Sequence, residues 1–463
     1  MTPATPVEGR PGLASAAGSA APTQGEHSSI LRVWRNAGLY TLANGLQRGS
    51  TVLIMPLLLS RLSVADYGRY GLLLSIYALL PNFLGLALNG AISRFYFDSK
   101  DEVERRRIIG ALLTFDAVFI VFATLVLDRF LGRFVLSMDS LPYRPYLQIT
   151  LWASAAVAIN EAVLAFWRAA ELPIWVGAAQ LITFGSSIGS ISYFMLVKQL
   201  GLTSVPLGLL IGQGSVGLVI LTIAIRQTEP NWNAGLYLNA LKYSLPLLPH
   251  LSIAWVLRAS DRWIVEHFCG SERLGVYFFS YQIASVLSLV MYSANDAIVP
   301  RFLSAYRDQG RPGAQRYHSR IFPLYLWTGT VLAVAIITLS PALVAVLPRG
   351  RVLQDPLLAA ILTGAMLLSA VYIPFANGLF ALKSTLKLTL MTVGCGVLEI
   401  GLNLSLVPRL GIHGAALSML LAYACLLVLV HAIAVRRLGL AAHWGHLWGA
   451  VAVLAVVSLI ACR

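Results

Sequence analysis

Apolar residues fill most of the chain in runs of about 20 residues, the length with which an α-helix spans the hydrocarbon core of a bilayer. Strands of an outer-membrane barrel would alternate apolar and polar residues in shorter segments, and the sequence has none of these. The pattern predicts an all-α polytopic membrane protein with about 12–13 transmembrane helices. The apolar runs cover residues 37–60, 70–96, 108–127, 146–168, 173–197, 203–225, 241–265, 275–300, 321–346, 357–382, 388–408, 411–435 and a short 445–461.

The composition also indicates a membrane protein. Hydrophobic residues make up 57% of the 463 positions and charged residues 12%, against about 25% charged residues in soluble domains. This excludes a water-soluble enzyme, because too few charges remain to cover its surface. The formal net charge of +14 does not indicate nucleic-acid binding, since membrane proteins concentrate Lys and Arg in cytoplasmic loops. The four cysteines are scattered and form neither a disulfide framework nor a metal-binding pair.

The chain begins with a stretch rich in Pro, Ala, Gly and Ser that lacks the apolar core of a signal peptide. We expect this stretch to be a disordered cytoplasmic tail. The charges of the later loops agree with that orientation, because loops rich in Lys and Arg stay in the cytoplasm. The loops after the second and eighth runs carry Lys100, Arg105, Arg106 and Arg107, and Arg307, Arg311, Arg316 and Arg320, respectively.

An internal repeat relates two halves of the chain. The segment YGRYGLLLSIYALLPNFLGLALNGAISRF (Tyr67–Phe95) matches LGVYFFSYQIASVLSLVMYSANDAIVPRF (Leu274–Phe302) at a constant offset of 207 residues, so Gly68 corresponds to Gly275. Each copy lies on the second helix of a six-helix block. Both halves therefore have the same topology, which predicts two six-helix lobes related by a pseudo-two-fold axis along the membrane normal, as in many transporters.

The repeat also predicts the division of the chain. The expected parts are a tail at 1–30, an N-terminal lobe at 31–226, an inter-lobe linker at 227–240, a C-terminal lobe at 241–437 and a short hydrophobic segment at 438–463.

Polar residues interrupt the first two helices of each lobe. On the first helix they recur every three or four residues and form a stripe down one face. Ionisable groups inside a bilayer are costly, so they point to function. We expect these faces to line one shared cavity. The candidate substrate-binding residues are Asn44, Gln47, Arg48, Asn82, Asn89, Arg94, His250, Arg258, Asp261, Gln282, Asp296 and Arg301.

Several of these residues also have a purely structural interpretation. Polar side chains could simply join helices by hydrogen bonds. Arg258 could be neutralised by Asp261, one turn away. Arg94 and Arg301, at helix ends, could extend to the membrane interface. Arg48 is harder to explain structurally, because a guanidinium in the middle of a span keeps its charge and must face water, a carboxylate or an anionic ligand.

Three carboxylates within the predicted spans are candidates for ion coupling. Asp116, Glu161 and Glu399 could each titrate and couple transport to protons or sodium ions. Each could equally be the permanent partner of an arginine, as Glu161 and Arg168 on one helix face suggest. No other cofactor is expected.

The sequence carries no constellation for covalent catalysis. It has no Walker motif, no nucleophile triad and no metal-ligand cluster, so we expect a protein that is not an enzyme. The stretch Gly212–Gly217 fits the spacing GxGxxG, yet it lies inside an apolar run with no strand before it. We therefore interpret it as small-residue helix packing.

Particular stretches of the sequence resemble a known family. They are LANGLQRGSTVLIMPLLLSRLSVADYGRYGLLLSIYALL, NGAISRFYFD, and LKYSLPLLPHLSIAWVLRASDRWIVEHF followed by LGVYFFSYQIAS. These stretches resemble the Wzx-type lipid-linked oligosaccharide flippases, the polysaccharide-transport branch of the multidrug/oligosaccharidyl-lipid/polysaccharide (MOP) exporter superfamily. The resemblance runs from about Trp34 to Val435 and is strongest over the first two helices of each lobe.

The resemblance implies a bacterial inner-membrane protein that moves undecaprenyl-diphosphate-linked repeat units to the periplasmic leaflet, for O-antigen, capsule or exopolysaccharide assembly. It implies alternating access around a cationic cavity, to which Arg48, Arg94, Arg258 and Arg301 would contribute. Arginine forks suit a diphosphate. A polysaccharide polymerase and a chain-length regulator would be the partners, besides the lipid-linked substrate and the bilayer.

Two other functions stay open. A multidrug exporter of the same superfamily would need an acidic cavity to attract cations. A membrane glycan polymerase or ligase would usually carry a large periplasmic loop with catalytic residues, and the expected outer loops are short.

Overall fold

The computed structural model describes residue 49 and residues 51–99, 101–131, 140–347, 355–440 and 444–461. Within these ranges the chain forms helices and no strands, which confirms the predicted all-α fold class. The helices are an unlabelled Thr51–Arg61, α2 (Val64–Leu84), α3 (Leu88–Phe95), α4 (Glu102–Val126), α6 (Gln148–Ala169), α7 (Pro173–Leu196), α8 (Ser204–Gln227), α9 (Ala234–Ser244), α10 (Leu247–Val346), α12 (Pro356–Val371), α13 (Ile373–Ala381), α14 (Thr385–Leu410), α15 (Ile412–Leu438) and α16 (Trp444–Ala461). Short turns of π- or 3₁₀-helix lie at Leu127–Leu131, Tyr143–Leu147 and Gly201–Thr203.

Short polar side chains begin several of these helices. The Ser63 hydroxyl accepts a hydrogen bond from the backbone of Asp66 at 3.1 Å and caps α2. Asp101 caps α4 and Asp355 caps α12 in the same way. Each cap satisfies a backbone N–H that has no partner within the helix. The caps therefore fix the residues at which α2, α4 and α12 begin.

The three spans predicted at 241–265, 275–300 and 321–346 lie in α10, apart from the first six residues of the first span, which lie at and just after the end of α9. This element contains two glycines with positive φ, Gly270 (φ 78°) and Gly310 (φ 62°). Glycine adopts these angles without steric cost, so a single residue turns the chain at each place. α10 is thus three helical segments, 247–269, 271–309 and 311–346, joined without the longer loops that the sequence suggested.

The second predicted span, 70–96, is not one straight helix. α2 and α3 meet at an angle of 49°. Between them, Leu86 (φ 48°) and Ala87 (φ 53°) take left-handed conformations that non-glycine residues rarely adopt. The single-helix prediction was wrong here, because hydrophobicity records the length of a span and not a break in its backbone.

The region predicted as an inter-lobe linker is partly helical. α9 begins at 234, within the expected linker 227–240, and Asn233 caps it. Tyr237 stacks on Phe115 of α4 with ring centroids 4.4 Å apart, and Trp232 packs against the edge of Tyr237. These aromatic contacts hold α9 against the N-terminal helices.

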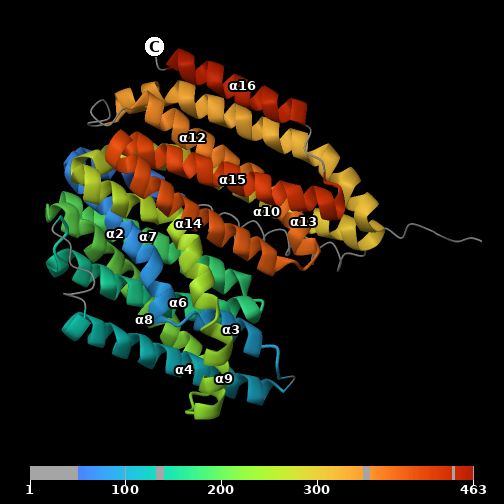
Figure 1. The fold of residues 1–463 in the computed structure, drawn as a ribbon. Coiled ribbons are helices and arrows are strands. Elements are labelled where there is room, and N and C mark those ends of the chain that lie inside the picture. Colours follow the sequence, from blue (N-terminus) through green and yellow to red (C-terminus); the bar gives the residue numbers. More distant parts are fainter. Residues whose placement is uncertain are drawn as a thin grey trace, which may run out of the picture.

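Figure 1 shows two groups of helices, with α12 to α16 in one and α3, α4, α6, α8 and α9 in the other. Between them, α2 packs on α10. Gly68 lies so close to α10 that a Cβ atom there would overlap the Ser271 carbonyl oxygen. A Cβ on Gly275 would likewise overlap the Val64 carbonyl oxygen. The two contacts are related by the offset of 207 residues, so the repeat predicted from the sequence forms a pseudo-symmetric crossing between the lobes.

Small residues of α8 also pack closely against α7 and α6. A Cβ atom on Gly212 would lie 2.5 Å from the Cα atom of Ser187, and one on Gly217 would lie 2.6 Å from Oδ1 of Asn160. Gly214 has open space around it. The interpretation of Gly212–Gly217 as a helix-packing stretch is therefore confirmed.

Eight helices within the described ranges are long and apolar enough to cross a membrane, and α2 with α3 makes a ninth if the bent pair is one span. One of the eight, Ala259–Ala342, has 84 residues and includes both glycine turns of α10, which divide it into more than one crossing. The short last run is present as α16, which has 18 residues. The chain is thus a multi-pass membrane protein.

Adding a methyl group at the crossing tests whether the backbone contact is needed. We expect Gly68→Ala and Gly275→Ala each to lower the melting temperature of the detergent-solubilised protein, since overpacking typically costs about 1–3 kcal/mol. Gly214→Ala is the matched control and should not lower it, because its new methyl group meets open space. Equal melting temperatures for all three variants would contradict the close crossing.

Candidate functional site

A cavity among the described residues lies within the N-terminal group of helices. It has a volume of about 370 Å³ and is lined by Thr51–Arg61, α2, α6, α7 and α8. Its walls are mainly apolar, but polar side chains of α6, α7 and α8 also line it. The Asn160 amide donates hydrogen bonds to Oε1 of Gln213 at 2.8 Å and to the Gln213 backbone oxygen at 3.2 Å. Glu161, on the same wall, accepts a hydrogen bond from Arg168 at 3.0 Å.

This location differs from the expected cavity shared by both lobes. The polar side of α2 contacts α10 directly, and two tryptophan side chains of α10 cover it there. Trp263 donates to the Ser75 hydroxyl at 2.9 Å, and Trp255 donates to the Ser75 carbonyl at 2.7 Å. The glycine crossing brings the helices too close for a cavity at this level. Hydropathy alone did not indicate that bulky indoles would reach across the lobe boundary.

A buried arginine sits at the crossing, and the sequence analysis missed it. Arg262 of α10 is 8% exposed and donates to the Gly71 carbonyl of α2 at 3.3 Å. Its guanidinium lies 4.8 Å from the ring centroids of both Phe278 and Tyr281. Such cation–π contacts stabilise a desolvated guanidinium. Its position directly after Asp261, inside an apolar run, was the available signal, but the sequence pointed to Arg258 as the partner of Asp261.

Asp261 is fully enclosed beside this arginine. It accepts a hydrogen bond from the Tyr277 hydroxyl and another from the backbone N–H of Arg262 at 2.9 Å. It also interacts electrostatically with the Arg262 side chain. The carboxylate is therefore held by partners from two segments of α10.

Glu399 of α14 adds a second buried carboxylate to the same region. It is 1% exposed, and neither of its oxygens has a hydrogen-bond partner among the described residues. It interacts electrostatically with Asp261 and Tyr277. Asn403, one turn along α14, is also fully buried, and its side chain has no hydrogen-bond partner within the described ranges. Asp261, Arg262, Tyr277 and Glu399 form what we call the junction cluster.

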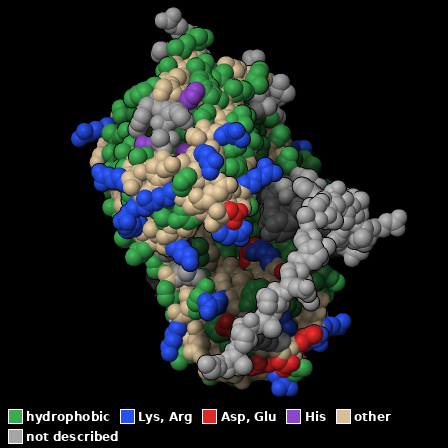
Figure 2. Space-filling view, turned by 90° about the vertical axis from the view of Figure 1, so that its right-hand side faces the viewer, with side chains coloured by type: hydrophobic (Ala, Val, Ile, Leu, Met, Phe, Trp, Pro, Cys, Tyr) green, Lys and Arg blue, Asp and Glu red, His purple; other side chains and the backbone are tan. Residues whose placement is uncertain are grey.

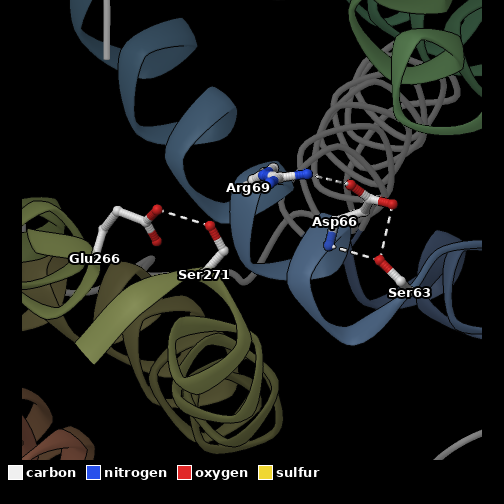
Figure 3. Close-up of polar contacts among 5 residues, drawn as sticks. All are labelled: Ser63, Asp66, Arg69, Glu266 and Ser271. Atoms are coloured by element: carbon white, nitrogen blue, oxygen red, sulfur yellow. Dashed lines mark hydrogen bonds and ion pairs between the residues drawn. The ribbon is translucent and has the colours of Figure 1, made fainter. Parts of the chain in front are cut away.

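Further polar contacts lie where α2 begins and α10 turns (Figure 3). Arg69 donates to Asp66 at 3.0 Å within α2. On α10, Ser271 donates to Oε1 of Glu266 at 2.7 Å. These pairs stay within their own helices, so the contact between the lobes at this end rests on backbone and rings rather than on ion pairs drawn across it.

The remaining predicted site residues are dispersed. Asn44, Gln47 and Arg48 lie outside the described residues, and so do the side chains of His250 and Arg258. Arg94 is an exposed residue at the end of α3, 3.7 Å from Asp98. Gln282 is buried, whereas Asp296 and Arg301 are exposed. Asn82, Asn89, Asp116 and Glu161 come together at a second, smaller cavity.

Basic side chains gather at one end of the molecule. The connection from α3 to α4 lies at this end (Figure 1). Seen from there, Figure 2 shows Lys and Arg side chains on both groups of helices and a hollow between the groups. We call this the basic end. The glycine crossing lies toward the opposite end, where α2 begins. The lobes therefore meet at one end and part at the other.

Among the described residues, no group of three or more His, Cys, Asp or Glu side chains could hold a metal ion. Amide and backbone oxygens are not among these groups, and amide side chains do line the smaller cavity.

Comparison with solved structures defines the class of fold. The chain is similar to a structure of the lipid II flippase MurJ in an inward closed conformation, with a TM-score of 0.68 and 14% identity over 91% of this chain and 97% of that one. It is also similar to a MOP superfamily transporter from Pyrococcus furiosus (TM-score 0.60, 14% identity, 87% and 96% coverage) and to a MATE transporter mutant from Vibrio cholerae (0.59, 16%, 90% and 99%). The fold is thus that of two-lobed MOP transporters.

The family is shown by sequence. A model of the polysaccharide biosynthesis protein family matches residues 33–306, and the chain belongs to this family. No curated protein matches the chain. The family match and the fold together confirm the resemblance to the polysaccharide branch of the MOP superfamily.

The burial of Arg262 can be tested against a more exposed arginine. We expect Arg262→Met to lower thermal stability strongly, because breaking a buried charged network typically costs about 3–5 kcal/mol. Arg168→Met removes a pair whose side chains are about one-third exposed and should change stability by less than about 1 kcal/mol. Melting temperatures of the solubilised variants make the comparison, and similar losses for both would contradict the assigned role of Arg262.

Proposed function

We propose that this protein is a flippase that moves undecaprenyl-diphosphate-linked oligosaccharide repeat units from the cytoplasmic to the periplasmic leaflet. Membership of the polysaccharide biosynthesis family carries the proposal. The two-lobed transporter fold supports it, because cargo with a large polar head must cross the apolar core inside a protein cavity. The product would supply O-antigen, capsule or exopolysaccharide assembly.

Alternating access is the proposed mechanism. The lobes touch at the Gly68 and Gly275 crossing and part at the basic end, so this conformation would accept cargo from that side. The basic end is then cytoplasmic, in agreement with its Lys and Arg content. Separation of α2 from α10 at the crossing would open the opposite side. The glycines themselves add no side-chain contact, so the hydrogen bonds from Trp255, Arg262 and Trp263 to α2 are the side-chain bonds that would break in this motion.

The polar head group would bind in the cavity of the N-terminal lobe. Asn160 and Gln213 present amides that hydroxyl groups of sugars can pair with. Thr51, which lines this cavity, is the last member of the polar stripe that includes Arg48. Residues three apart share a helix face, so Arg48 would supply the positive charge for the diphosphate. The lipid chain would stay in the bilayer.

The junction cluster is the proposed coupling element for a proton or sodium gradient. Glu399 has no fixed partner within the described ranges, whereas Asp261 is held by Tyr277 and Arg262. Because the two carboxylates interact electrostatically, the gain or loss of a cation at Glu399 would change the field at Asp261. The junction cluster contacts α2 through Arg262, so a change of charge in the cluster would act on the crossing.

The remaining parts of the proposal concern the cellular setting. The protein would lie in the bacterial inner membrane with a cytoplasmic N-terminus and would catalyse no covalent chemistry. A polysaccharide polymerase and a chain-length regulator would act on its product.

A multidrug exporter is the second candidate function. One observation favours it: the charged residue that lines the 370 Å³ cavity is the carboxylate Glu161. Its pairing with Arg168 weakens this argument, because the pair presents little net negative charge to a cationic drug.

Deletion of the gene in the native host tests the flippase. We expect surface polysaccharide to be lost while lipid-linked repeat units persist in the inner membrane, as quantified by mass spectrometry of extracted lipids. Wild-type protein should restore the surface polysaccharide and Arg48→Ala should not, because the diphosphate then lacks its cation. Arg307→Ala, at an exposed arginine paired with its neighbour Asp308, is the control and should restore export.

Two results would contradict the proposal. Export restored by Arg48→Ala at normal protein levels would remove the role of this arginine. Unchanged surface polysaccharide together with new sensitivity to cationic drugs would favour the exporter.

A further inference from the structure

The break between α2 and α3 encloses a small cavity that the proposed mechanism does not use. Its volume is about 30 Å³, enough for one water molecule or one small ion. Gly85 lies at its corner. An ideal Cβ atom on Gly85 would lie 3.3 Å from the Pro81 carbonyl oxygen and 3.7 Å from Oδ1 of Asp116. The two oxygens therefore face the same small space.

Asp116 is the unusual residue of this cavity. It lies in the middle of α4 and is 1% exposed. Its Oδ1 atom is fully enclosed and has no hydrogen-bond partner, and no described Lys, Arg or His forms an ion pair with it. An ionised carboxylate in such a place is costly unless a positive charge neutralises it. Among the described residues, therefore, no positive charge is in place to balance an ionised Asp116.

The other side chains around the cavity offer oxygen atoms. Asn82 and Asn89, on either side of the break, provide amide oxygens. The Asn89 oxygen also accepts from the Gly90 N–H at 2.8 Å and is held in place by it. Glu161 completes the wall from α6. Carboxylate, amide and carbonyl oxygens are the ligands of hard cations such as those of the alkali and alkaline-earth metals.

The charges at the cavity favour a monovalent ion. Glu161 is neutralised by Arg168, whose guanidinium lies 3.0 Å from it. This leaves the single charge of Asp116, which one monovalent cation balances and a divalent cation would exceed.

We propose that Asp116, Asn82, Asn89 and Glu161 form a sodium-binding site at the α2–α3 break. The site is separate from the junction cluster. It adjoins the 370 Å³ cavity, because Glu161 lines both cavities. Sodium here would fix the bend of α2–α3 against α4 and α6, and so would set the shape of the cargo cavity. The proposal does not depend on which cargo the protein moves.

Binding of radioactive ²²Na⁺ to the purified full-length protein tests the site. The measurement uses detergent-solubilised protein in a choline buffer without lipid-linked cargo, so failure of the flippase proposal would not affect it. We expect saturable binding to wild type and the loss of one equivalent of Na⁺ in Asp116→Asn. Asp308→Asn should retain this equivalent, since Asp308 is an exposed carboxylate paired with Arg307 and lies in neither the small cavity nor the junction cluster.

Gly85→Ala is a second variant that removes no ligand. The backbone of Gly85 (φ −89°, ψ 7°) is open to alanine, and the new methyl group would occupy the small cavity. It should abolish the same equivalent of binding with the protein still monodisperse in gel filtration. Gly214→Ala is the matched control and should bind as wild type does.

Three results would overturn the sodium site. One is equal Na⁺ binding by wild type and Asp116→Asn, and another is unaltered binding by Gly85→Ala. The third is the absence of Na⁺ binding to monodisperse wild type, which would leave Asp116 as a protonated, uncharged side chain.

Discussion

Contact between two glycine backbones, Gly68 on α2 and Gly275 on α10, is the constraint on which the rest of the molecule depends. A Cβ atom on either residue would overlap a carbonyl oxygen of the other helix. Only at this separation can Arg262 of α10 reach the Gly71 carbonyl and Trp263 reach the Ser75 hydroxyl. Because the contact is repeated about a pseudo-two-fold axis, one local fit sets the position of two whole lobes. The lobes then part toward the basic end (Figure 2).

A second constraint follows from burial in an apolar environment. An ionised side chain is stable there when it has an opposite charge or hydrogen-bond partners, and only some of the buried ionisable side chains have them. Asp261 and Arg262 have partners from neighbouring segments, whereas Asp116 and Glu399 have no hydrogen bond within the described ranges. The paired groups hold the crossing, and the carboxyl groups without such partners are the ones to which the proposals assign ion binding.

Much of this architecture could be predicted from the sequence. The length of the apolar runs indicated the helices, and the offset between Gly68 and Gly275 indicated the symmetry. Both properties can be read from the order of residues alone. The break at Leu86 and Ala87 could not be predicted, since it depends on backbone angles at residues with no special composition. Arg262 was overlooked because its hydrogen-bond partner Gly71 is on α2, far away in sequence, and its aromatic partners are on another segment of α10. The sequence predicted Asp116 as a candidate for ion coupling and Asn82 as a candidate for substrate binding. Only the packing of α4 on the broken helix places the two residues at one cavity.

Distance measurements between the lobes test the central claim, that the crossing is a closed gate which opens as the basic end closes. Spin labels would be placed at exposed positions in a background without native cysteines, with Glu171 and Lys383 at the basic end and Gln199 and Arg409 at the opposite end. With purified lipid-linked oligosaccharide in nanodiscs, electron–electron double resonance should report a shorter distance for the first pair and a longer distance for the second. Distances that do not change, or that change in the same direction at both ends, would contradict the account.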